Sequence, residues 1–338
     1  MRATSCAPGR QRSPIHMTPL AELIREEIRR AGPIPFRRYM ELALYHPEHG
    51  YYRRARDPFG KSGDFYTAEQ VQPVFGILIA AYFRRLYEEM DRPAGFRIVE
   101  LGAGRAEMAR ELSAFDYTPV DVDRGELPEK FTGAVFANEF FDALPVEAVV
   151  QRGGRLLRML VGWSGERFEW IEGEPAAPAI QSYVDAYIAP LEEGALIEAN
   201  VEGLGWIERI AARLERGFVL AIDYGYTTRE SIRFPRGTLM SYRRHTAAED
   251  VLADPGECDI TAHVCFTALE RHAARCGFET VRFESLARTL LDAGEADQFA
   301  AALAATNGAE TVRRRLQLKT LLFGMGETFR ALLLRKAD

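Results

Sequence analysis

The 338-residue chain has few features that would indicate metal, redox or nucleic-acid chemistry. None of its four cysteines have C-x-x-C spacing, so they indicate neither a zinc site nor a disulfide framework. Lysine and arginine number 43 against 49 acids, and the resulting net charge of −6 offers no basic field for a nucleic acid. The longest apolar run, Val74–Phe83, is too short to cross a bilayer, so we expect no membrane insertion.

The most informative stretch runs from Arg97 to Arg105. Its apolar residues predict a buried strand that ends in a glycine turn, and residues 106–115 are predicted to form a helix. Gly102 and Gly104 have no side chains, so a ligand can approach the backbone there. A helix beginning after the turn would point free N–H groups at that ligand, as in nucleotide-binding α/β folds.

Two classes of cofactor compete for such a turn. The dinucleotide fingerprint requires a third glycine, and Glu107 stands in its place. Glu100, two residues before the first glycine, favours S-adenosylmethionine, because a carboxylate at the strand end can hold the cationic methionine part of that cofactor. A tight turn that binds nothing is the structural alternative.

Two further strand ends carry polar residues. Asp121 and Asp123 follow a predicted strand, where either could accept the ribose hydroxyls of a nucleoside or simply form a turn. A buried strand over residues 134–137 leads into Asn138 and Glu139, and the carboxyl ends of parallel strands are where α/β sheets bind ligands. We therefore expect Asn138 to hold either a backbone group or the cofactor.

The pattern along the chain predicts an α/β protein with a Rossmann-like sheet. We expect a disordered tail over residues 1–16 and a helical N-terminal region with a flap over 17–95. Residues 96–146 and 204–338 are predicted to form the core, with a loop-rich lid over 227–262. Alternating residues between 147 and 203 predict an inserted antiparallel cap.

Several separate motifs together resemble one family. They are found at residues 32–40, 43–52, 63–67, 138–146, 223–226, 237–245, 259–264 and 317–320, and include Asn-Glu-Phe-Phe-Asp-Ala-Leu-Pro and Asp-Ile-Thr-Ala-His-Val. This combination resembles the MidA-like S-adenosylmethionine-dependent methyltransferases, the family of the mitochondrial complex I assembly factor. The resemblance spans most of residues 17–335 and implies a class I methyltransferase fold with an inserted cap.

The resemblance also implies a function and a partner. For the mitochondrial members it implies arginine N-methylation of a complex I subunit, and it implies that Gly63 and Asp64 fold over the cofactor. We expect a protein substrate and a cytoplasmic location, or the mitochondrial matrix if the source is eukaryotic. The alternatives are a small-molecule N- or O-methyltransferase and a non-catalytic assembly protein that retains the fold.

The chain departs from the family pattern in two places. Ala106 replaces the third glycine of the family's turn. Asn138 follows Gly102 by only 36 residues, whereas a complete core needs two strands and their helices in that interval. Since one such unit takes roughly 30 residues, about one β-α unit is predicted to be missing.

Carboxylates at the strand ends are the candidate catalytic residues. An arginine side chain is charged and a poor nucleophile, and carboxylates can orient it by paired hydrogen bonds. We expect Glu139 and Asp223 to face the cleft, and Asp142 either to join them or to cap a following helix.

Overall fold

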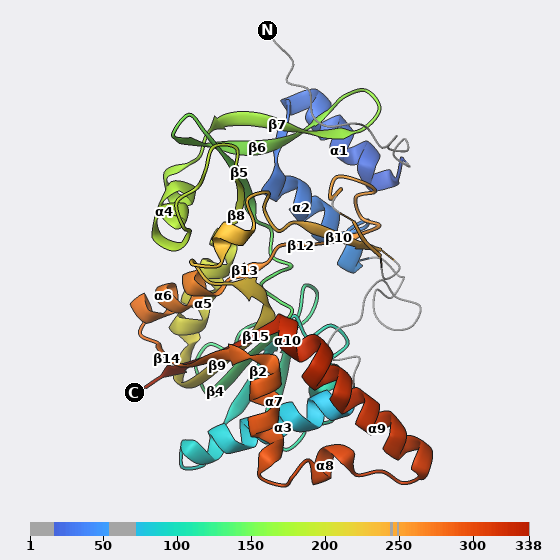
Figure 1. The fold of residues 1–338 in the computed structure, drawn as a ribbon, viewed down its shortest axis with the longest axis vertical. Coiled ribbons are helices and arrows are strands. Elements are labelled where there is room, and N and C mark those ends of the chain that lie inside the picture. The colour runs from blue at the N-terminus through green and yellow to red at the C-terminus, as the bar shows by residue number, and fades with distance from the viewer. Residues whose placement is uncertain (1–16, 54–71, 244–245, 249, 338) are drawn as a thin grey trace.

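The structure is a computed structural model, and it describes residues 17–53, 72–243, 246–248 and 250–337. The expected tail over 1–16 and the flap residues Gly63 and Asp64 lie outside these ranges. Two lobes lie one above the other in Figure 1, and the chain crosses between them several times. No helix in the described ranges has the length and apolar character needed to span a membrane.

The lower lobe contains a seven-stranded sheet of mixed direction. Its strands lie in the order β14-β15-β9-β4-β2-β3, and β13 pairs with β9. The bounds are β2 (Arg97–Leu101), β3 (Asp116–Val120), β4 (Phe131–Asn138), β9 (Leu214–Tyr226), β13 (Val264–Cys265), β14 (Glu279–Ser285) and β15 (Phe329–Lys336). Strands β3, β2, β4 and β9 are parallel, and β15 runs against β9. This sheet confirms the predicted α/β, class I methyltransferase-like fold.

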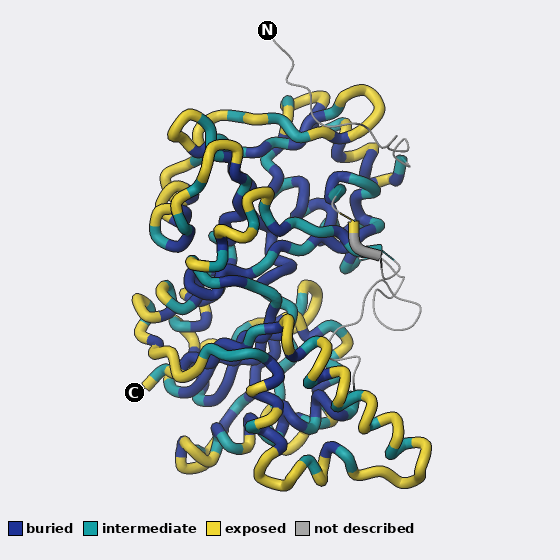
Figure 2. The backbone as a smooth tube through the Cα atoms, in the orientation of Figure 1, coloured by how far each residue is buried: buried dark blue, intermediate teal, exposed yellow. Residues whose placement is uncertain are grey.

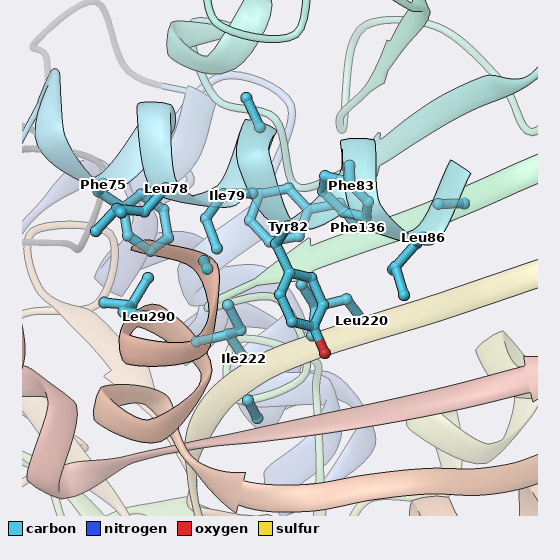
Figure 3. Packing of buried hydrophobic residues seen from close by; sticks show 14 of the residues in the cluster. Phe75, Leu78, Ile79, Tyr82, Phe83, Leu86, Phe136, Leu220, Ile222 and Leu290 are labelled. Carbon is cyan, nitrogen blue, oxygen red and sulfur yellow. The ribbon is translucent and has the colours of Figure 1, made fainter. Parts of the chain in front are cut away.

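Helices cover both faces of this sheet. Helices α3 (Val74–Glu89) and α7 (Leu286–Glu295) pack on one face, and α5 (Val201–Arg213) and α6 (Phe266–Arg275) pack on the other. Successive strand residues alternate between the two faces. Figure 3 shows Phe83 of α3 against Phe136 of β4, and their ring centroids are 5.6 Å apart.

The upper lobe is built on an antiparallel sheet. It contains β1 (Ile34–Pro35), β5 (Glu147–Arg152), β6 (Arg155–Trp163), β7 (Phe168–Pro175) and β8 (Leu196–Ala199), with α4 (Pro178–Tyr187) beside them. Helices α1 (Pro19–Ala31) and α2 (Phe36–Tyr45) also pack here, and the Phe36 ring lies 4.8 Å from that of Trp170. Residues 17–95 are thus divided, because α1 and α2 join the inserted sheet while α3 joins the core.

The remaining elements are short or lie at the C-terminal end. They are η1 (Tyr51–Arg53), η3 (Glu107–Ala109), η4 (Ser231–Arg233), β10 (Met240–Arg243), β11 (Thr246–Ala248), β12 (Asp259–Thr261), α8 (Ala300–Leu303), α9 (Gly308–Thr320), η5 (Leu321–Met325) and α10 (Gly326–Thr328). The predicted loop over 227–262 is therefore partly ordered, since β10 pairs with both β11 and β12 in a small antiparallel sheet.

The predicted helix over residues 106–115 is wrong. The segment forms the single 3-10 turn η3 and further turns, and Ala106 has the left-handed φ of 58° that interrupts a right-handed helix. Only 14 residues connect β2 to the parallel β3 beside it, and they must reverse direction at both ends. The glycine turn therefore has no long helix behind it.

The core is shortened as the sequence predicts. Between β2 and β4 the described residues contain one strand, β3, and it forms an edge of the sheet. The backbone carbonyl of Val120 points toward the β2 side of the sheet, because it accepts the N–H of Ala103, just after β2, at 3.2 Å. The backbone polar groups of successive strand residues point to opposite sides of the strand, so those of Pro119 point to the open edge of the sheet. Proline has no N–H there, which removes a donor that another strand could use.

Phe83→Ala tests the packing between α3 and the sheet. Phe83 is fully buried, so the substitution is expected to lower the free energy of unfolding by about 3–5 kcal/mol in urea denaturation. Phe323→Ala is the matched control, because Phe323 is 76% exposed and its loss is expected to change that free energy by less than about 0.5 kcal/mol. Equal effects of the two substitutions would contradict this packing.

Candidate functional site

The candidate site lies where the parallel strands β2, β4 and β9 end. Glu100, next to the end of β2, is buried, and its carboxylate accepts a hydrogen bond from the Tyr117 hydroxyl. The chain then turns through Gly102 and Gly104, which have φ values of +67° and +49°. These left-handed conformations explain why glycine occupies both positions.

Asp121 supports the glycine turn from the end of β3. Its carboxylate accepts the N–H of Gly104 at 2.6 Å and that of Val122 at 2.6 Å. Arg124 completes the turn by donating to the Gly104 carbonyl at 2.6 Å. Asp123 points elsewhere, since its side chain is 63% exposed and forms an ion pair with Arg53. Of the two expected ribose acids, only Asp121 therefore adjoins the turn.

The groups around Gly102 fit the cationic amino-acid end of S-adenosylmethionine. The Oδ1 of Asn138 is buried and has no hydrogen-bond partner among the described residues, so it offers a spare acceptor. Its Nδ2 donates to Glu139 at 3.3 Å. A Cβ added to Gly102 would lie 3.1 Å from the Phe140 ring, a tight contact that adds to the cost of a side chain at this positive φ.

Glu139 begins the loop after β4 in an unusual conformation. Its φ of 51° is left-handed, which is rare for a residue with a side chain. The N–H of Glu139 donates to the Ile222 carbonyl of β9 at 2.9 Å, and this bond holds the backbone in place. The conformation thus sets the direction in which the loop leaves the sheet.

Asp223 of β9 lies beneath this loop and is fully buried. Its carboxylate accepts the N–H groups of Phe141 at 3.0 Å, Asp142 at 3.2 Å and Tyr224 at 2.9 Å. The expectation that Asp223 faces the cleft therefore differs from the structure, in which its oxygens bind the backbone. Asp142 has no helix to cap, since residues 139–146 contain no helix.

Four carboxylates, those of Glu139, Asp142, Asp223 and Asp259, form an acid cluster. Burial raises the pKa of Asp142 well above its usual range, and the charges of Asp223, Glu139 and Asp259 add to that rise. Burial and the Glu139 charge likewise raise the pKa of Asp223, against the effect of its three backbone donors. A cation would relieve the repulsion within this cluster.

Two tyrosines of the upper lobe close over the acid cluster. The Tyr45 hydroxyl donates to the Ala143 carbonyl at 2.8 Å, and the Tyr52 hydroxyl donates to Asp259 at 2.9 Å. Their rings stack with centroids 5.6 Å apart, and burial raises the pKa of both hydroxyls. The upper lobe therefore forms one wall of the candidate site.

The structure brings Glu139, Asp142 and Asp223 together as one group. Sequence reasoning gave no role to Tyr45 and Tyr52, although both stand in a motif that carries the family resemblance. Nothing in their local pattern indicates contacts with Ala143 and Asp259, which lie 98 and 207 positions further along the chain. Those contacts follow only from the packing of α2 and η1 against the loop after β4 and against β12.

Comparisons with known proteins show which family this chain resembles. The model of the Methyltransf_28 family, described as S-adenosyl-L-methionine-dependent methyltransferases, matches residues 114–284. The mitochondrial protein arginine methyltransferase NDUFAF7 homolog of Drosophila melanogaster is 28% identical, with 75% of this chain and 70% of that protein covered. Human mitochondrial protein arginine methyltransferase NDUFAF7 is 25% identical, with 76% and 69% covered.

Two crystal structures from Burkholderia thailandensis share the fold. One, bound to S-adenosyl-homocysteine, has a TM-score of 0.84 and 28% identity over 94% of this chain and 92% of that chain. The other has a TM-score of 0.79 and 30% identity over 94% and 91%.

Asp142→Asn tests the electrostatics of the acid cluster. Because folding raises the pKa of Asp142, its contribution to stability is complete below the unfolded carboxyl pKa of about 3.9 and is lost as the pH rises through the folded pKa. The variant is therefore expected to exceed the wild type in free energy of unfolding at pH 8, and this advantage should shrink as the pH approaches 4. Urea denaturation across that range measures it.

The exposed Asp185 provides the matched control. Asp185→Asn should keep the wild-type dependence of stability on pH. If the stability of the Asp142→Asn variant also varied with pH as that of the wild type does, Asp142 would not be held in a buried acid cluster.

Proposed function

Since the chain belongs to the family of S-adenosyl-L-methionine-dependent methyltransferases, we propose that it methylates arginine side chains of a partner protein. The observation that carries this proposal is the buried acid cluster beside the glycine turn. A guanidinium is a planar cation with donors that match carboxylates in pairs. The names of the NDUFAF7 relatives, as protein arginine methyltransferases, support the same substrate.

In this proposal the cofactor binds at the ends of β2 and β4. Glu100 and the Asn138 Oδ1 hold the ammonium of its methionine part, and Gly102 and Gly104 let it approach the backbone. When bound, S-adenosylmethionine supplies a methyl group on a sulfonium. Asp121 has a supporting role, because it holds the turn through the Gly104 N–H.

The flap residues have a proposed role that depends on the resemblance alone. Gly63 and Asp64 would cover the cofactor from the N-terminal region, and they lie outside the described residues. Asp123 is exposed and paired with Arg53, so we assign the support of the cofactor turn to Asp121 rather than to Asp123.

The acceptor arginine is proposed to bind against Glu139 and Asp142. Two carboxylates on one side of a guanidinium draw its positive charge toward the nitrogens that they bind, which leaves the remaining nitrogen more nucleophilic. Asp223 is a positioning residue, because it fixes the loop that carries both acids. Alignment of the acceptor nitrogen with the methyl group can supply roughly 7–11 kcal/mol of the barrier reduction.

The resemblance suggests a respiratory complex I subunit as one acceptor. We further propose a cytoplasmic location or, in a eukaryotic source, the mitochondrial matrix; the names of the NDUFAF7 relatives describe those proteins as mitochondrial. Labelled methyl transfer from S-adenosylmethionine to a cell lysate, followed by hydrolysis and amino-acid analysis, tests the proposed substrate. Recovery of label as methylarginine would support the proposal, and label in small molecules alone would refute it.

Glu139→Gln tests the acceptor side of the site. The substitution removes the charge while keeping the shape, so methyl transfer to protein is expected to fall roughly 100-fold, a loss comparable to that of an oxyanion-hole donor. Cofactor affinity, measured by calorimetric titration, should stay near wild type. Glu129→Gln is the matched control, because Glu129 is exposed just before β4 at the opposite end of that strand. Full activity in both variants would remove the proposed role of Glu139.

Gly102→Val tests the cofactor side. The valine side chain would strain the positive φ and crowd the Phe140 ring, so cofactor binding is expected to be lost in the titration. Gly95→Val separates strain from crowding, since Gly95 has a φ of +73° with no atom within 4 Å of its Cβ position. Unchanged affinity in Gly102→Val, or equal loss in the two variants, would count against a cofactor at this turn.

A further inference from the structure

The C-terminal helices project from the lower lobe at its edge. Helix α9, η5 and α10 follow one another without a break and form the red helical segment in Figure 1. One side of this segment packs on the core through Leu318, Leu322 and Met325, and Gln317 donates to the Gln72 carbonyl at 2.5 Å. No residue of α9 is fully buried, and Figure 2 shows how much of this helix is exposed.

The outer side of this segment carries an apolar stripe. It consists of Val312, Leu316 and Phe323, which are 58%, 59% and 76% exposed. Phe323 is the most exposed large apolar side chain among the described residues. Val312 and Leu316, four residues apart, lie on one side of α9, and Phe323 continues the stripe from the π-helical turn η5. Single exposed apolar residues are ordinary, but three in line form a surface suited to a partner.

The charge around the stripe is opposite in sign to that of the whole chain. Helix α9 contains Arg313, Arg314, Arg315 and Lys319 against the single acid Glu310, whereas the chain has a net charge of −6. Glu310 binds Arg314 at 2.8 Å and Arg313 at 3.8 Å. Arg315 and Lys319 are exposed, and neither takes part in an ion pair within the described ranges. An acidic surface would complement them.

The charge and the position of the stripe indicate which kind of partner it binds. Two copies that paired through α9 would bring two surfaces of the same positive sign together, which is unfavourable. The segment leads directly to the candidate site, because Phe329 follows α10 and its ring lies 3.9 Å from that of Tyr224. Leu316 and Phe329 are about 20 Å apart at the helical rise. A folded protein covers that span with a preformed surface, whereas a peptide shorter than about six residues, at roughly 3.4 Å per residue, does not reach it.

We propose that the stripe of Val312, Leu316 and Phe323, with Arg315 and Lys319 beside it, binds an acidic and partly apolar surface of the protein that carries the methyl acceptor. This inference rests on the proposed function, because it assumes that the acceptor is a protein. The segment would then select a whole acceptor protein at a distance from the reacting arginine. The apolar side chains of the stripe would provide affinity. The two cations would speed association with the acceptor protein and fix its orientation.

The test compares two stripe variants on two forms of the same acceptor. The variants are Leu316→Ser with Phe323→Ser, and Arg315→Glu with Lys319→Glu. The acceptor is a lysate of cells lacking this protein, used either intact or after digestion with a glutamate-specific protease that leaves arginines in place. Matched controls are Leu23→Ser, at a residue 48% exposed on α1, and Arg155→Glu, at an exposed residue of β6.

Both stripe variants are expected to label intact proteins at least about tenfold more slowly, the loss typical of interface anchors. They should label the digested peptides, and bind S-adenosylmethionine in calorimetric titration, as the wild type does. The two controls should label both preparations normally. The charge variant should also remove most of the salt dependence of labelling.

Several results would overturn the proposal. Stripe variants that label intact proteins at the wild-type rate would exclude a docking role, as would an equal loss on intact proteins and on peptides. Vesicles of phosphatidylcholine and phosphatidylserine that sediment the wild type, but not the variants, with labelling unchanged, would identify a lipid surface instead. If the wild type itself gives no methylarginine in either preparation, the proposed function fails, and this inference fails with it.

Discussion

The buried carboxylate of Asp223 is the constraint on which the candidate site depends. It lies on β9 and accepts three backbone N–H groups, two of them from the loop that follows the neighbouring strand β4. Hydrogen bonds to a charged group contribute about 1.5–3 kcal/mol each, which offsets part of the cost of burying the charge. One side chain thus joins the ends of two parallel strands and determines where the loop lies.

This use of Asp223 determines which acids remain for chemistry. Its oxygens are occupied by the backbone, so Glu139 and Asp142 are the carboxylates of the loop that could bind a cationic acceptor. Glu139 has a left-handed backbone, a conformation that costs of order 1–3 kcal/mol in a residue with a side chain. The bond from its N–H to Ile222 and the bonds from the loop to Asp223 hold it there. In the proposed site, this backbone conformation would direct the Glu139 carboxylate toward the acceptor.

The sequence predicts the parts of the site that follow from local patterns. Strands such as Arg97–Leu101 and Phe131–Asn138 are built around short apolar stretches, residues 98–99 and 134–137, and polar residues at their ends indicate a binding edge. The inward direction of Asp223 could not be predicted, because it depends on the position of a loop 80 residues earlier in the chain. The helix expected after Gly104 fails for a related reason, since only the pairing of β2 with β3 shows how short the crossover is.

Pairing between distant residues also explains why strands form within residues 227–262, where the sequence predicts a loop. Strand β10 is stabilised by β12, and the long segment between them has no strand-like pattern of its own beyond the short β11. Tyr45 and Tyr52 show the same limit, because the Tyr45 hydroxyl reaches Ala143 across the boundary between the lobes and the Tyr52 hydroxyl reaches Asp259 of β12, 207 positions further along the chain. Local periodicity carries no information about such contacts.

The shortened core changes how the cofactor turn is supported. In a sheet with a further strand and helix beyond β3, those elements would cover the turn, and here Pro119 closes the edge instead. The turn is held by Asp121 and Arg124, and Asp123 of the same segment is paired with Arg53 from the other lobe. The wall of the acid cluster comes from that lobe as well, through Tyr45 and Tyr52. Because one lobe contacts both halves of the candidate site, a change in how the lobes meet would alter cofactor and acceptor binding together.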